Sequence, residues 1–303
     1  MLRLLPLLII LFSAAPLKAL TRSDSLNSRQ IRTRRIVLIS STGAAGAGSL
    51  LYLNEAWYKD YKTENFHFFN DGQEWLQMDK LGHAFSTYQC GRLMMQAFDW
   101  AGYSGAQKLW IGGAMGFYYM SLVECLDGFS EGWGFSWPDE LANACGAGLA
   151  MAQEALWKEQ RVQLKFFYHN SGLAGYNAQL LGNTAYTRPI KDYNGQSYWL
   201  SFTPATFMHR KCVLPSWLNI SLGYGASGMI GANQNPQLKD AQGNPISLER
   251  YRRVFLSLDL DLTRLPVRNK NLRALLSVLN VIKFPAPTLE FSQGHFTFHA
   301  LYP

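Results

Sequence analysis

The order of apolar and polar residues divides the chain into two halves. In the first half, long apolar stretches rich in small residues alternate with short polar or glycine-rich connectors. Stretches of this length and spacing predict helices, and short connectors make neighbouring helices antiparallel. The pattern therefore predicts a four-helix bundle, with helices at residues 36–52, 80–100, 107–126 and 138–158.

From about residue 165 the period changes to two. Val254, Leu256, Leu258, Leu260 and Leu262 alternate with mostly polar residues, which predicts a half-buried strand. The same reading predicts an antiparallel sheet on roughly four strands, and a short helix before two prolines. The other expected strands are 198–202, 217–230 and 288–300, and the expected helix is 272–282.

The predicted fold class is therefore α+β, with a helical bundle followed by a sheet region. Four strands are too few to close a transmembrane barrel, since such barrels start at eight. The sheet must then pack on the helices, pair with another chain or lie on a membrane.

The first residues predict export from the cytoplasm. Arg3 precedes a short apolar run at 4–12, and small residues at 14–19 form a cleavage region with the cut expected after Ala19. The expected cleavage region contains no cysteine, so lipoprotein processing is not expected. The predicted organisation is a signal peptide at 1–19, an Arg-rich tether at 20–35, the bundle at 36–160 and the β-rich region at 165–303.

The apolar stretch at 36–52 is at the short limit for spanning a bilayer. After signal cleavage, the preceding cluster of Arg29, Arg32, Arg34 and Arg35 would lie outside the inner membrane, against the positive-inside tendency. This conflict favours a helix packed in a bundle, or one at the outer membrane, over an inner-membrane anchor.

Composition supports an envelope protein. Of the 303 residues, 48% are hydrophobic, 14% aromatic and only 16% charged, which suits membrane association better than a cytosolic enzyme. The formal net charge is +7, but no basic patch is interleaved with aromatic residues, so nucleic acid is not an expected partner. The Arg cluster is open to two readings, a solvated linker or a contact with anionic lipid.

The cysteines carry no metal or redox motif. Cys90, Cys125, Cys145 and Cys212 have no CxxC spacing. The first three fall in predicted apolar helices, where cysteine behaves as a small hydrophobic residue. No disulfide is expected.

Polar side chains stand at three predicted helix ends. Asp79 and His83 are four residues apart on one helix face, as are Asp139 and Asn143, and Glu124 ends a third helix. Because the helices alternate in direction, these ends belong to the same end of the bundle. The sequence therefore predicts that these side chains converge.

Three readings of this convergence remain open. The first is a catalytic or metal site, in which the side chains act as acid and base with shifted pKa values or bind a divalent cation. Its residues would be Asp79, His83, Glu124 and Asp139. The group could instead receive a lipid or peptide head group, or be a hydrogen-bonded network that fixes the packing. One histidine is weak evidence for zinc, so the metal and any cofactor stay unknown. The expected binding residues beside the four are Lys80, Asp127, Ser136, Trp137 and Asn143.

These motifs resemble a known family. The run Asp79-Lys80-x-x-His83, then Glu124 and Asp127, then Gly134-x-Ser136-Trp137-x-Asp139 and Gly146, is similar to the DUF2279 or YfiM-like group, which is described as predicted periplasmic (lipo)proteins. The resemblance covers about 78–158, and the sheet-rich remainder looks like the longer form of Bacteroidetes-type bacteria. The motif order also distantly resembles VanZ-type membrane proteins, linked by family to glycopeptide resistance. The resemblance implies an envelope location and no assigned activity.

We therefore expect an exported protein of the periplasm or membrane, at the outer membrane rather than the inner. The first hypothesis is a structural or interaction module with a membrane lipid or envelope protein as partner. The second is an enzyme or binder acting on an envelope lipid or cell-wall precursor through the His/carboxylate group. A third is an accessory of an outer-membrane secretion or assembly system.

Overall fold

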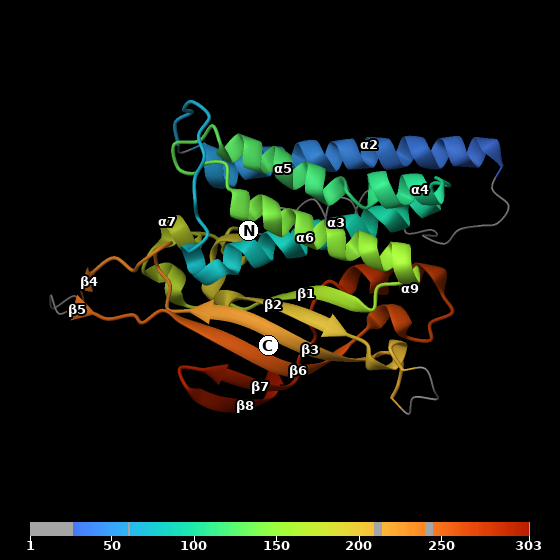
Figure 1. The fold of residues 1–303 in the computed structure, drawn as a ribbon. Coiled ribbons are helices and arrows are strands. Elements are labelled where there is room, and N and C mark those ends of the chain that lie inside the picture. Colours follow the sequence, from blue (N-terminus) through green and yellow to red (C-terminus); the bar gives the residue numbers. More distant parts are fainter. Residues whose placement is uncertain (1–26, 60, 209–213, 240–244, 303) are drawn as a thin grey trace.

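Helices form the N-terminal half of the described chain and an antiparallel sheet forms the C-terminal half (Figure 1). The structure is a computed structural model that describes residues 27–59, 61–208, 214–239 and 245–302. The predicted signal peptide and Cys212 lie outside these residues.

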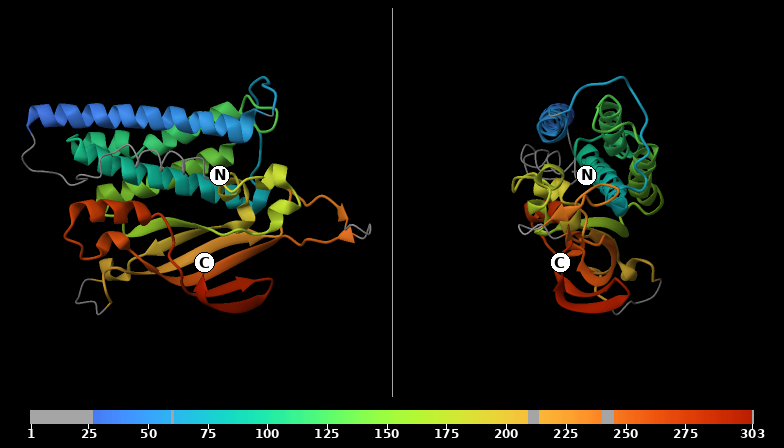
Figure 2. Two further views of the ribbon diagram at one scale, coloured as in Figure 1. Left: turned by 180° about the vertical axis from the view of Figure 1, so that it is seen from behind. Right: turned by 90° about the vertical axis from the view of Figure 1, so that its left-hand side faces the viewer.

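Four long helices run side by side along the molecule (Figures 1 and 2). They are α2 (Ser28–Leu53), α3 (Met78–Trp100), α5 (Met115–Asp127) and α6 (Trp137–Trp157). Helix α3 is buried along most of its length between the other helices and the sheet, because its apolar and small residues face every side. Shorter helical turns are η1 (Asn54–Tyr58), η2 (Glu74–Gln77), α4 (Gly105–Gln107), η3 (Lys108–Gly112), α7 (Ala178–Leu181) and α8 (Arg188–Lys191).

Two helices differ from the prediction. Helix α2 begins at Ser28 and not at residue 36, because Asn27 and Gln30 form a reciprocal capping box there. The Arg-rich segment is thus helical from Ser28 onward. The helix expected at 107–126 is divided into α4, η3 and α5, and a Cβ added to Gly91 of α3 would lie 2.4 Å from the carbonyl oxygen of Gly113 at the break.

The main sheet has six strands in the order β1-β2-β3-β6-β7-β8, and every neighbouring pair is antiparallel. The segment expected as one strand at 288–300 is a hairpin, because Gln293 and Gly294 adopt positive φ and reverse the chain. The predicted short helix is α9 (Lys270–Leu279). The strands are β1 (Val162–Tyr168), β2 (Gln196–Phe202), β3 (Leu218–Ser227), β6 (Tyr251–Leu260), β7 (Ala286–Ser292) and β8 (His295–Tyr302), with a separate pair β4 (Leu238–Lys239) and β5 (Pro245–Ile246).

The two faces of the sheet have opposite chemistry. One face is buried yet largely polar, and Lys165 Nζ lies 2.8 Å from Asp259 Oδ2 on it. Asn219 of β3 also lies on this buried face. The opposite face is apolar, and on β6 it carries the alternating Val254, Leu256 and Leu258.

The helical and sheet halves share a hydrophobic core. Phe85 of α3 packs against Phe166 of β1 and Tyr198 of β2, with ring centroids 5.7 and 5.8 Å away. The same cluster includes Met78 at the start of α3 and Tyr193 from the segment before β2. This core holds the first turn of α3 in place, and the polar site lies there.

Candidate functional site

Three helix ends meet at one end of the helical layer. The first turn of α3 supplies Asp79, the last turns of α5 supply Glu124, and the first turn of α6 supplies Asp139. All three carboxylates are buried. The antiparallel order of the helices brings these ends together, as the sequence predicted.

The chain enters α3 in an unusual backbone conformation. Trp75, Leu76 and Gln77 all have φ between 49° and 65°, the left-handed region that non-glycine residues rarely adopt. The sheet holds this turn, since Tyr224 Oη donates to the Leu76 carbonyl oxygen and Arg252 donates to Gln77 Oε1. Such strain, of order 1–3 kcal/mol per residue, persists only where the surroundings impose it. Here it sets the direction in which Asp79 and Lys80 enter the site.

Lys80 joins carboxylates from three segments. Its Nζ lies 2.7 Å from Asp71 Oδ2, 2.8 Å from Asp139 Oδ1 and 3.2 Å from Asp79 Oδ2. Burial alone would lower the pKa of Lys80, but the charges of Asp79, Asp139 and Asp71 raise it above its ordinary value. Lys80 is therefore a fixed cation at the centre of the group.

His83 lies beneath the carboxylates and is 1% exposed. Its Nδ1 is 3.0 Å from Asn143 Oδ1 on α6, so Nδ1 carries the proton and donates it to the amide oxygen. Its Nε2 faces three carboxylate oxygens, at 3.7 Å from Glu124, 3.7 Å from Asp139 and 3.9 Å from Asp79. These three distances exceed hydrogen-bond length.

Ser136 connects the helix end to the carboxylates. Its Oγ accepts from the Asp139 backbone N–H at 3.2 Å, which caps α6, and donates to Asp71 Oδ1 at 2.5 Å. Its backbone N–H donates to Glu124 Oε2 at 3.2 Å. The loop before α6 is thus tied to the same carboxylates as Lys80 and His83.

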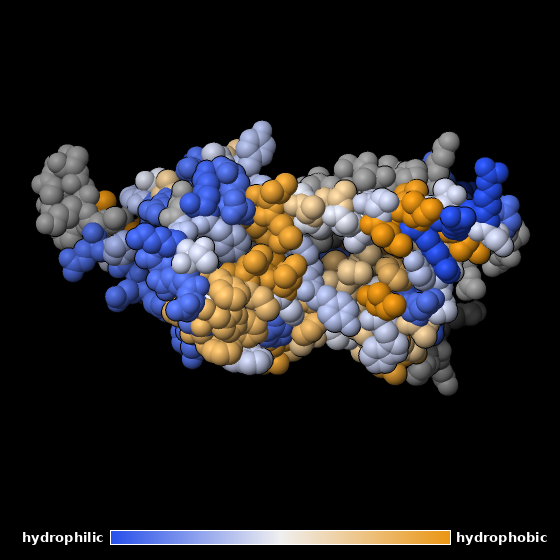
Figure 3. Space-filling view, turned by 90° about the horizontal axis from the view of Figure 1, so that it is seen from above, coloured by the Kyte–Doolittle hydropathy of each residue, from blue (hydrophilic) through white to orange (hydrophobic). Residues whose placement is uncertain are grey.

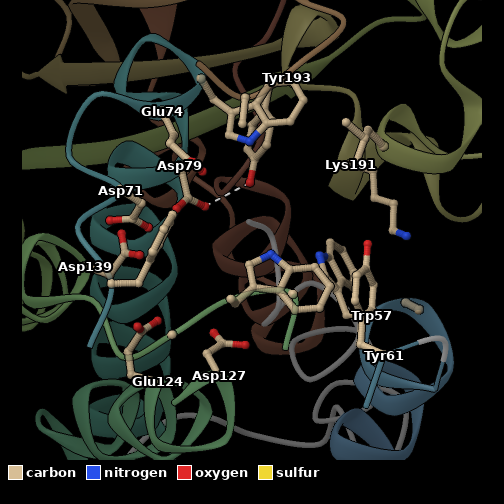
Figure 4. Close-up of a pocket in the computed structure, with 18 of the residues that line it drawn as sticks. Trp57, Tyr61, Asp71, Glu74, Asp79, Glu124, Asp127, Asp139, Lys191 and Tyr193 are labelled. Atoms are coloured by element: carbon tan, nitrogen blue, oxygen red, sulfur yellow. Dashed lines mark hydrogen bonds between the residues drawn. The ribbon is translucent and has the colours of Figure 1, made fainter. Parts of the chain in front are cut away.

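A cavity of about 220 Å³ opens beside this group. Figure 4 shows the acidic side chains of Asp79, Asp139 and Glu124 on one side, with Trp57 and Tyr61 across from them. Tyr193 Oη donates to Asp79 Oδ1 at 2.8 Å, and Tyr58 Oη donates to Asp127 Oδ1 at 2.6 Å. The described lining includes Ala56, Trp57, Tyr61, Phe69, Asp71, Glu74, Trp75, Asp79, Glu124, Asp127, Gly132, Trp133, Gly134, Asp139, Gln179, Leu180, Lys191, Tyr193 and Ala232.

The site gathers several buried carboxylates around Lys80. Burial, with the charges of Asp79 and Glu124, raises the pKa of Asp139 well above its ordinary value, against the opposing effect of Lys80. Burial and the charges of Asp71 and Asp79 likewise raise the pKa of Glu74. Burial and neighbouring negative charges both disfavour the ionised form of a carboxyl group. The five buried carboxylates of the site are Asp71, Asp79, Glu124, Asp127 and Asp139.

The donor atoms suit a divalent cation. One ligand atom each from Asp79, His83 and Asp139 lies within 4.8 Å of the others, and Glu124 Oε1 adds a fourth at 3.7 Å from His83 Nε2. Imidazole nitrogen with carboxylate oxygens fits Mn²⁺, Fe²⁺ or Zn²⁺. Asn143 supplies the hydrogen bond that orients a metal-binding histidine.

The structure places the predicted residues in three positions. Asp79, Glu124, Asp127 and Asp139 line the cavity. Four other predicted residues lie behind the cavity or connect its walls. Trp137 is the exception, because it is 66% exposed and stacks on Phe68 outside the cavity. The four are Lys80, His83, Ser136 and Asn143.

Sequence reasoning missed several site residues. Asp71 lies in the aromatic segment before α3, where a single carboxylate carries no spacing signal. Tyr193 comes from the C-terminal half, more than 100 positions from Asp79, and only the fold brings it near. Trp57 of η1 and Tyr61, which follows η1, line the cavity from the segment after α2.

A family model described as "Predicted periplasmic lipoprotein (DUF2279)" matches residues 67–155. This range covers α3, α5, most of α6 and the loop that carries Asp71. The description supports an exported envelope location and assigns no activity. No curated protein and no solved structure matches the chain.

Proposed function

We propose that the protein binds a divalent cation at Asp79, His83, Glu124 and Asp139, and that the cation holds the polar head group of an amphiphilic envelope ligand. The observation that carries this proposal is the position of His83 Nε2, 3.7–3.9 Å from carboxylate oxygens of three helix ends. Ligands that share one metal at 2.0–2.2 Å lie about 3–3.6 Å apart, so a small contraction completes the site.

The adjoining cavity supports a ligand with both polar and apolar parts. Asp79 and Asp127 line its acidic side, with Trp57 across from them (Figure 4). Trp133 also lines the cavity. Lys191 Nζ lies 4.9 Å from the Trp57 ring centroid, which adds a positive charge at that wall. A bound cation would offset the acidic side and let it receive a phosphate or carboxylate head group, while the indoles contact the apolar part. This ligand class includes envelope lipids and lipid-linked cell-wall precursors.

The proposal includes a membrane-associated four-helix bundle at the outer membrane. Three observations support this: the family description of an exported protein, the many exposed apolar side chains of the helical layer, and a cavity lined by both polar and apolar groups. Separating inner from outer membrane by density, followed by detection of the native protein, tests the location.

A structural network is the second candidate, and Lys80 favours it. The lysine binds three carboxylates at 2.7–3.2 Å without any metal. Ser136, the cap of α6, donates hydrogen bonds to one of them, Asp71, and to Glu124. In that case the group fixes the packing of a module that meets an envelope partner.

Metal titration separates the two candidates. The full-length protein in detergent is stripped with a chelator, and Mn²⁺, Zn²⁺, Mg²⁺ and Ca²⁺ are titrated by calorimetry. We expect one Mn²⁺ or Zn²⁺ per chain. Asn143→Ala should weaken binding about 10–100-fold, because it removes the hydrogen bond that orients His83. Asp139→Asn should weaken it at least as much.

The matched control is Asp99→Asn. Asp99 lies at the other end of α3, and its side chain is 35% exposed. The control should bind the metal as the unaltered chain does. If the unaltered chain binds no divalent cation while Asp139→Asn lowers its stability, the cation site is wrong and the structural network is supported.

A further inference from the structure

The apolar face of the sheet packs on α3 at β1 and β2, and it is exposed over β3, β6, β7 and β8. On β3, β6, β7 and β8 its side chains alternate outward while the polar partners alternate inward. Apolar-out with polar-in is the reverse of a sheet that faces water, and it is the pattern of strands that face lipid. Six outward side chains are 44–68% exposed: Leu222, Val254, Leu256, Leu258, Phe291 and Phe298.

The helical layer has a similar outer face. Figure 3 shows apolar side chains gathered along it, with hydrophilic groups towards the two ends. Two helical segments, Ser28–Tyr58 and Gly105–Asp127, are long and apolar enough to cross a membrane, and only 22% and 33% of their most apolar windows are buried. Outward side chains that are 47–73% exposed include Ile39, Trp110, Tyr118, Leu122, Leu141 and Leu156.

Each of these elements contains a charge-free stretch. Residues 36–54 of α2 and η1 carry no charge, nor do 109–123 or 141–153 of the neighbouring helices. The first of these stretches is about 27 Å long at 1.5 Å per residue. The outward face of β6 is also free of charge from Val254 to Leu260. The helices run lengthwise in the molecule and the strands run in the same general direction with a tilt (Figure 2). We call these charge-free stretches together the apolar band.

The two ends of the band differ in charge. At one end, Arg34 and Arg35 donate hydrogen bonds to the carbonyl oxygens of Trp100 and Gly102 at the end of α3. The amphipathic α9 lies at this end, with Leu272 and Leu275 about 42–43% exposed beside basic residues (Figure 1). The acidic cavity lies at the opposite end.

We propose that this apolar band is embedded in the hydrocarbon of a membrane, with the helix and strand axes crossing it. The acidic cavity then opens at one membrane surface, and the basic end contacts anionic head groups at the other. The inference deepens the membrane association in the proposed function and rests on it. The orientation would give a lipid-anchored ligand direct access to the cavity.

Two observations favour lipid over a second protein copy. The band follows both the helical side and the sheet side, whereas a pairing interface covers one patch. Its length of about 27 Å on α2 also matches the 25–30 Å apolar thickness of membranes. A basic end with exposed leucines complements anionic lipid.

Thiol labelling in vesicles tests this arrangement. Cys145 of α6 is exposed and free in the described structure, and it serves as the helical probe after Cys90, Cys125 and Cys212 are replaced by alanine. Leu256→Cys and Leu222→Cys in a cysteine-free chain are two independent probes of the sheet face. Controls at the two ends are Ser104→Cys and Glu131→Cys, both exposed. The vesicles contain phosphatidylethanolamine and phosphatidylglycerol.

Each outcome decides one part. With a charged maleimide present on both sides of the vesicle membrane, we expect all three band probes to react at least tenfold more slowly than the two end controls. All three should react readily with an apolar, lipid-soluble maleimide. Exclusion of both reagents would indicate a protein interface and overturn the proposal. Rapid charged labelling of Leu256→Cys and Leu222→Cys with a protected Cys145 would overturn embedding of the sheet. Metal titration of the same preparation is a separate readout, so loss of embedding with intact cation binding leaves the cation site standing.

Discussion

Lys80 joins three segments of the chain at the acidic end of the molecule. Its ammonium group lies within 3.2 Å of carboxylates from the loop before α3, from α3 and from α6. With its side chain only 13% exposed, these contacts are weakly screened by water. Removing the charge would leave the carboxylates facing one another.

We therefore expect Lys80→Met to lower the free energy of unfolding by about 3–5 kcal/mol in chelator, as for other broken buried ion pairs. Added Mn²⁺ should restore more stability to this variant than it adds to the unaltered chain, because the metal replaces the missing positive charge. Urea denaturation with and without metal measures both effects. Lys59→Met is the control, since the Lys59–Glu55 pair is 45% and 70% exposed and is worth about 0–1 kcal/mol. Equal losses in the two variants would contradict the role of Lys80.

At the residue scale, spacing along helices could predict part of the site. Asp79 and His83, four positions apart, had to share a helix face, and the alternating helix direction placed Glu124 beside them. Asp71 and Tyr193 could not be found in this way. Asp71 reaches Lys80 through an irregular left-handed turn, and Tyr193 reaches Asp79 through a tertiary contact. Neither contact leaves a periodic signal in the sequence.

At the scale of elements, the contact between α3 and α6 determines how close the site residues of these two helices lie to each other. A Cβ added to Gly146 would lie 2.0 Å from the Ala84 carbonyl oxygen and 2.3 Å from Thr87 Oγ1. A side chain there must push the two helices apart. Gly146 lies one turn from Asn143, so the displacement would reach His83 as well.

Gly146→Ala should therefore lower the free energy of unfolding by about 1–3 kcal/mol, as in other overpacked cores, and should weaken Mn²⁺ binding. Gly148→Ala is the matched control on the same helix, because its Cβ would meet nothing within 4 Å. It should be neutral or stabilise by up to about 1 kcal/mol through helix propensity. Chemical denaturation and calorimetry of both variants test this. A similar loss in both would mean that the glycines act through propensity and not through packing.

Helices with a regular apolar pattern were predictable to within a few residues, as α3 and α6 show. The break at η3 was not, because close contact between Gly91 and Gly113 is a tertiary property. The hairpin of β7 and β8 was read as one strand, since Gln293-Gly294 is a two-residue turn inside an otherwise uniform apolar pattern. β1 was missed because it immediately follows α6, and its Lys165 and Gln163 face a buried polar network that hides its strand character.

At the scale of the whole molecule, the two predicted regions meet in one hydrophobic cluster. Composition placed their boundary near residue 160, and the secondary structure does change there. Packing does not stop at this point, because Phe85 of α3 contacts rings from β1 and β2. Arg92 of α3 also donates to the carbonyl oxygen of Ser277 on α9. Composition cannot reveal such contacts, since both sides of the boundary are simply apolar.

We predict that the helical and sheet halves unfold as one cooperative unit. Phe85 is 1% exposed, so Phe85→Ala should remove about 3–5 kcal/mol of stability. Hydrogen exchange with mass spectrometry should then show the same loss of protection in peptides from α3 and in peptides from β2 and β3. Leu222→Ala, on the exposed sheet face, should change stability in detergent by no more than about 0.5 kcal/mol. If protection falls in α3 alone while β2 and β3 keep theirs, the halves are energetically separate. In that case the first turn of α3, and the cation site with it, would be positioned by the helices without the sheet.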